Sequence, residues 1–162
     1  MEVNSAEKLV KISTVIEEIY GDKLHKKRQL SLAYAAMGVL ASESLFLHRM
    51  AEGLVDTCGG SKKHATKQID RLLSNKGLSI WDVSASWVPY VLRDQREIMV
   101  ALDWTSFFDD EQTMLSLDLV TSKGVSTPLL WKSVNKNQLK HNRGRYEDQM
   151  LSRFKEILPE EV

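Results

Sequence analysis

The strongest constraint on the fold is a single change of hydrophobic periodicity along the chain. Up to about Leu92, apolar residues recur every three or four positions, the spacing of helices that bury one face. From about Glu97, apolar residues form short runs or alternate with polar ones, as they do in strands. The sequence therefore predicts an α+β protein, with a helical region at residues 1–92 and a strand-rich region at residues 93–162.

Five helices are expected in the first region. They cover Ser5 to Tyr20, Lys27 to Leu40, Ser44 to Val55, residues 62–75 and Ile80 to Leu92. The small side chains of "AYAAMG", residues 33–38, indicate that the second helix can approach a neighbouring helix closely. Pro89 is expected to kink the fifth helix or end it early, because proline has no backbone N–H to donate.

The helix expected in "KKHATKQIDRLLSN", residues 62–75, carries a basic face. Lys63, Lys67 and Arg71 recur every four residues and share one side, with Lys62 and His64 beside its start. A helix, a short glycine turn and a basic helix form the layout of a helix-turn-helix, whose second helix enters the DNA major groove. An ordinary solvated surface helix would carry the same charges, so both interpretations stay open.

Composition narrows the possible partners and compartments. The chain holds 22 Lys and Arg against 22 Asp and Glu, so any binding to nucleic acid must rest on a local patch. Its single cysteine, Cys58, excludes an intramolecular disulfide and suits a reducing compartment. No apolar run approaches the roughly 20 residues that cross a membrane. We therefore expect a cytoplasmic protein without a membrane partner.

The strand-rich region predicts three antiparallel strands and a helix. The nearly all-apolar run at residues 97–102 is typical of a central strand buried on both faces, and Asp103 stands at its end. Strands at residues 112–121 and 126–134 follow, joined by a glycine turn. The basic segment "NKNQLKHNRGR", in which His141 could contact a phosphate, leads to a helix over residues 146–158. A buried carboxylate at Asp103 would need a partner, a metal or water.

Three segments of this region resemble the DDE transposases of bacterial insertion sequences. They are "ALDWTSF", "LSLDLVTSKGVSTPLLWKSV" and "RYEDQMLSRFKEILPE". The resemblance implies a ribonuclease-H-like fold that starts with a three-stranded antiparallel meander and a helix. It also implies that Asp103 is the first catalytic, metal-binding aspartate, and that the helical region binds duplex DNA at transposon ends. Self-association or pairing with a full-length transposase would then be expected.

The sequence departs from that family after Pro159, where the second catalytic aspartate and the catalytic glutamate should follow. The resemblance therefore implies a truncated transposase that binds DNA and carries one catalytic aspartate. The Mg²⁺ or Mn²⁺ of the complete enzyme would bind weakly or not at all, because two hard cations need several carboxylates. The acids at positions 109 and 110 are expected to be solvated loop residues. The alternatives are a non-catalytic regulator or interaction partner of the full enzyme, and an unrelated small helix-turn-helix regulator with an appended sheet.

Overall fold

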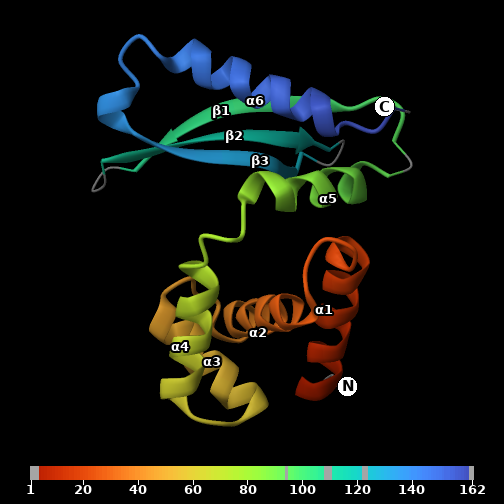
Figure 1. Ribbon diagram of the computed structural model, residues 1–162, viewed down its shortest axis with the longest axis vertical. Helices are drawn as coiled ribbons and strands as arrows, with labels where there is room; N and C mark the ends of the chain where they lie inside the picture. Colours follow the sequence, from red (N-terminus) through yellow and green to blue (C-terminus); the bar gives the residue numbers. More distant parts are fainter. Residues whose placement is uncertain (1–3, 94, 108–110, 122–123, 161–162) are drawn as a thin grey trace. The chain divides into compact units, whose positions relative to one another are not determined.

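The α+β class is confirmed by a computed structural model, which describes residues 4–93, 95–107, 111–121 and 124–160 (Figure 1). The helices of this described part are α1 (Ser5–Tyr20), α2 (Lys26–Ser42), α3 (Leu47–Cys58), α4 (Lys62–Leu73), α5 (Ile80–Leu92), the short 3-10 helix η1 (Lys136–Gln138) and α6 (Arg143–Ile157). The strands are β1 (Met99–Ser106), β2 (Gln112–Val120) and β3 (Ser126–Asn135). The chain divides into two compact units, Met1–Val83 and Ser84–Val162.

The helical unit is built on the close contact of α2 with α3. A Cβ atom added to Gly38 would lie 2.5 Å from the backbone oxygen of Met50, and one added to Gly53 would lie 2.9 Å from the oxygen of Gly38. The two helices therefore meet backbone to backbone, as the small residues of 33–38 predicted. Ile69 of α4 and Leu54 of α3 belong to the core beside this contact.

The start of α2 is fixed by a second apolar cluster and one buried amide. Ile16 and Tyr20 of α1 cluster with Leu24 and Ala33, so α1 covers the first turns of α2. The buried side chain of Gln29 donates to the carbonyl of Leu24 at 2.5 Å. A buried amide is stabilising only when it is hydrogen-bonded, and this bond positions the loop before α2.

The described helices differ from membrane spans in their length and apolarity. Taken singly, none of these helices is both long and apolar enough to cross a bilayer. α2 and α3 reach the required length and apolarity only as a pair, and a bend of 94° separates them.

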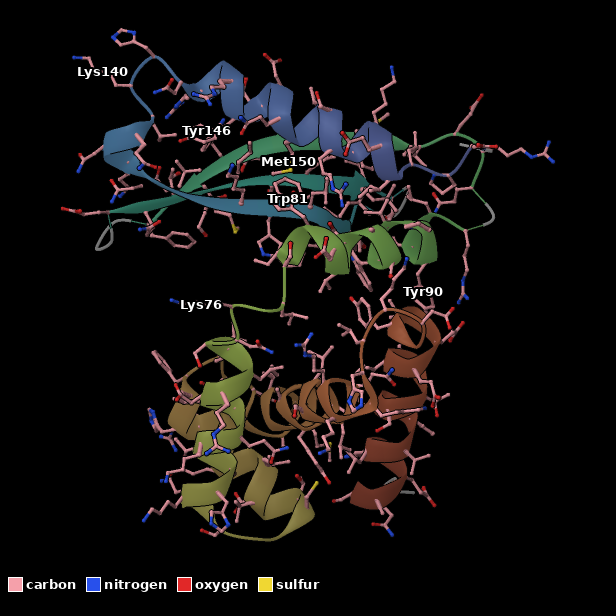
Figure 2. The ribbon with its side chains drawn as sticks, in the orientation of Figure 1. Lys76, Trp81, Tyr90, Lys140, Tyr146 and Met150 are labelled. Carbon is pink, nitrogen blue, oxygen red and sulfur yellow. The ribbon has the colours of Figure 1, made fainter. Side chains whose placement is uncertain are left out.

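The second unit is a three-stranded antiparallel sheet in the order β1–β2–β3 with a helix on each face (Figure 1). On one face, Trp104 Nε1 of β1 donates to Glu147 Oε1 of α6 at 2.7 Å, and Met150 lies between α6 and the sheet (Figure 2). On the other face, Trp87 Nε1 of α5 donates to the carbonyl of Pro128 at 2.8 Å. These contacts hold together the second unit, Ser84–Val162, which is called the β-unit below.

One local expectation, the central position of β1, is wrong. β1 is an edge strand rather than a central one, since only β2 is paired on both sides. Its residues alternate between exposed and half-buried, and Met99 is 68% exposed, because one face of the apolar run looks away from the core. α5 contains Pro89 and continues to Leu92, which is the end that the apolar spacing predicted.

Candidate functional site

An open groove of about 610 Å³ runs between α2 and α4 of the helical unit. The charged residues in its described lining are all cationic. The lining residues are Lys27, Arg28, Ser31, His64, Lys67, Gln68, Arg71, Leu72 and Asn75. None of these is acidic, so the groove concentrates positive charge on a chain whose formal net charge is zero.

Three of the five residues predicted to bind DNA line this groove. His64, Lys67 and Arg71 recur at helical spacing on the side of α4 that borders the groove. Lys62 and Lys63 are exposed but do not line it. The helical repeat explains the difference, because residues 64, 67, 68 and 71 share one face while residues 62 and 63 begin the helix beside it.

The sequence interpretation missed Lys27 and Arg28, which α2 contributes to the same groove. Their signal is present in the sequence, since Lys26, Lys27 and Arg28 form a basic run at the start of a helix. Helix starts favour acidic side chains, because the N-terminal end of the macrodipole is positive. Neither α2 nor α4 has an acidic residue in its first turn. In the groove, Lys27 and Arg28 stand against the dipole at the start of α2, which favours an anionic ligand there.

Arg28 has a structural role in addition to its charge. Its Nη1 donates to the carbonyl of Gly77 at 3.3 Å, and the amide of Gly77 donates to Asn75 Oδ1 at 3.0 Å. These bonds fasten the loop after α4 to the start of α2. Removing Arg28 would therefore disturb the groove itself, whereas exposed Lys27, Lys67 and Arg71 can be altered with less risk.

Lys62 is bound to a neighbouring helix. Its ammonium forms an ion pair with Glu52 of α3, which also accepts a hydrogen bond from Arg49 at 3.2 Å. The hydrogen bond from Lys62, followed by the charges of Lys62 and Arg49, lowers the pKa of the Glu52 carboxyl below its usual range. Lys62 therefore connects the start of α4 to α3.

This pairing gives a pH-dependent prediction. Because the folded pKa of Glu52 is lowered, its carboxylate favours the folded state above its unfolded pKa, and that contribution is lost as pH falls through the folded pKa. Lys62→Gln is expected to raise the pKa of Glu52 towards its ordinary value. A carboxyl-carbon NMR titration measures this directly, with Lys63→Gln as the matched control. An unchanged titration in Lys62→Gln would contradict the pairing.

Asp103 is in a different setting from the one expected. It lies inside β1 with Trp104, Thr105 and Ser106 still to follow in the strand, and its side chain is exposed. The hydroxyl of Thr105 donates to Asp103 Oδ2 at 3.2 Å, so the nearby partner is a hydroxyl rather than a cation. No burial penalty therefore demands a metal there.

The described residues also do not fit a two-metal centre. Among them, no group of three or more His, Cys, Asp or Glu side chains could hold a metal ion. The nearest acid on the neighbouring strand, Asp118, accepts a hydrogen bond from Ser116 at 2.7 Å. Positions 109 and 110 lie outside the described residues.

Comparison with known proteins points away from transposases. A curated protein of Chlorobium phaeobacteroides named HPr kinase/phosphorylase is 30% identical to this chain over 106 residues. The match covers 62% of this chain and 31% of that protein, so the chain spans less than a third of its relative. No family model matches the chain, and no solved structure matches it.

The resemblance to insertion-sequence transposases is therefore wrong. The matching relative is named for a different activity, and no family model connects the chain with transposition. The resemblance relied on the short core "LDWT" and on a meander followed by a helix, and three paired strands with a covering helix are compatible with many α+β folds. Transposon ends and a full-length transposase no longer follow as partners. The basic groove between α2 and α4 remains a candidate binding site, because it is defined by the side chains that line it and not by the resemblance.

Proposed function

We propose that the helical unit binds duplex DNA through the groove between α2 and α4, and that the protein acts as a non-catalytic binding module. The observation that carries the proposal is the convergence of Lys27, Arg28, Lys67 and Arg71, with His64, on one groove whose described lining includes no acid. DNA phosphates are a continuous array of anions, and Lys and Arg side chains are their usual partners.

The connection of α3 to α4 supports a helix-turn-helix-like arrangement. Three residues separate the helices, and Gly59 and Gly60 have φ of 76° and 100°, the left-handed region that favours glycine. A short turn of this kind leaves α4 exposed along its basic face. The ribonuclease-H-like interpretation of β1–β3 and α6 is retained only as a fold proposal, supported by the meander and the helix that follows it.

The proposal predicts a specific loss of DNA binding. A triple variant, Lys27→Gln, Lys67→Gln and Arg71→Gln, removes three groove cations but keeps Arg28, which holds Gly77. Each lost phosphate contact should reduce the slope of log K against log salt by about 0.9, so the triple variant should lose up to roughly three units of slope. A shift assay with one duplex at several salt concentrations measures both affinity and slope.

A matched variant controls for net charge. Lys8→Gln, Lys11→Gln and Lys23→Gln remove the same charge from exposed positions that do not line the groove. This control should retain most of the affinity and most of the salt slope. If both triple variants bind as well as the parent, or lose binding equally, the groove is not the DNA site.

The name of the relative favours a second candidate function for the groove. A phosphate-binding groove could equally serve a module that accompanies protein phosphorylation, as the name HPr kinase/phosphorylase suggests for the relative. The sequence contains no Gly-rich phosphate loop of the type G-x-x-x-x-G-K-[ST], so kinase chemistry is not assigned to this chain. Replacing the duplex with HPr, with or without phosphorylation, in the same binding assay separates the two candidates.

A further inference from the structure

The β-unit contains a second cationic hollow that the proposed DNA groove does not explain. It has a volume of about 680 Å³ and lies where the end of β1 meets the segment from η1 to α6. Its described lining consists of Ser106, Lys136, Leu139, Lys140, His141, Arg143 and Gly144. Three of these are Lys or Arg, one is His, and none is a carboxylate. Figure 2 shows Lys140 in the loop that precedes α6.

Hydrogen bonds hold this loop in a fixed shape. The carboxamide Nδ2 of Asn142 donates to the carbonyl of Gln138 at 3.0 Å and to that of Lys140 at 3.3 Å. The ammonium of Lys136 donates to the carbonyl of Phe107, which ties η1 to the end of β1. His141 has a φ of 63°, a conformation uncommon outside glycine. The segment "NKNQLKHNRGR" is therefore organised by its own contacts around the hollow.

The start of α6 borders the same hollow and increases its positive potential. Asn142 precedes the helix and makes no side-chain capping hydrogen bond, while its Nδ2 donates to the loop carbonyls. The first turn contains Arg143 and Arg145 and no acidic residue. A Cβ added to Gly144 would meet no atom within 4 Å, so this part of the turn is open. The cations of the hollow and the N–H groups of the helix start attract the same kind of ligand.

We propose that this hollow binds a phosphate group, either free phosphate or the terminal phosphate of a small phosphomonoester. Lys140 and Arg143 supply charged donors, and the first turn of α6 supplies backbone donors. A compact dianion satisfies several such donors at once, whereas an extended polymer suits the longer row of cations in the helical unit. The site lies wholly within the unit Ser84–Val162, so it is independent of the DNA groove.

The test is an NMR titration of the ¹⁵N-labelled full chain with inorganic phosphate at constant ionic strength. Saturable shifts are expected at the amides of residues 143–145, and AMP should produce shifts at the same amides if a monoester is accepted. A double variant, Lys140→Gln with Arg143→Gln, should weaken binding by about tenfold or more, because each lost charge-assisted hydrogen bond contributes substantially. Lys155→Gln with Arg96→Gln removes the same charge from exposed positions outside the hollow and should bind as the parent does.

Three further results bear on the proposal. The groove variant Lys27→Gln, Lys67→Gln and Arg71→Gln should bind phosphate normally, which keeps this site distinct from DNA binding. Shifts that appear only with duplex DNA, and not with phosphate or AMP, would overturn the proposal in favour of a nucleic-acid surface. Equal shifts with chloride, or equal weakening in both double variants, would show general charge screening and would also overturn it.

Discussion

Gly38→Ala is expected to destabilise the helical unit by about 3 kcal/mol, near the upper end for adding one methyl group to a packed core. The new Cβ would lie 2.5 Å from the backbone oxygen of Met50, and the carbon of that carbonyl would be only 3.2 Å away. A backbone atom inside a helix cannot rotate aside as a flexible side chain can. The helices α2 and α3 would have to separate, which would open the core around Ile69.

Gly144→Ala is the matched control for this substitution. A Cβ at Gly144 meets nothing within 4 Å, and alanine is favoured over glycine in a helix, so this variant should be neutral or slightly stabilised. Urea unfolding monitored by hydrogen exchange, with peptides taken separately from residues 1–83 and 84–162, assigns each effect to its unit. A Gly38→Ala protein as stable as the parent would show that α2 and α3 do not meet backbone to backbone.

Local patterns predicted most of the elements because each signal lies within a few residues. The ends of α1 and of α5 were predicted without error, since apolar spacing and flanking residues mark them. The position of β1 in the sheet was predicted wrongly, because it depends on which strands pair with β1. The run at residues 97–102 suggested burial on both faces, yet in β1 only the side that carries Val100 and Leu102 is half-buried.

Local sequence patterns also located only part of the candidate site in the groove. His64, Lys67 and Arg71 were found because they share one helix, and helical spacing places them together. Lys27 and Arg28 come from a helix distant in sequence, and only the packing of α2 against α4 brings them to the same groove. The burial expected for Asp103 was wrong for a related reason. Its expected burial depended on β1 being central, and its expected partners depended on a resemblance that the comparison contradicts.

A second large loss of folding stability is expected when a buried leucine of the sheet is truncated. Leu117→Ala should destabilise the β-unit by about 2–5 kcal/mol, because leucine truncation in a core loses transfer free energy and leaves a cavity. Leu117 is 0% exposed and lies on the central strand, directly opposite Leu102 on β1 and Leu130 on β3. The cavity would therefore weaken the packing of all three strands. Hydrogen exchange in peptides from residues 99–135 should rise, while peptides from the helical unit, residues 1–83, should remain protected.

Leu151→Ala provides the comparison, because Leu151 is 46% exposed on α6 and its truncation leaves no enclosed cavity. The two variants remove the same atoms, so the difference between them isolates the burial of Leu117. Equal destabilisation by both would contradict the central position of β2. Loss of protection in the helical peptides of Leu117→Ala would show that the two units unfold together, and the phosphate and DNA measurements would then have to be made on variants whose stability has been matched.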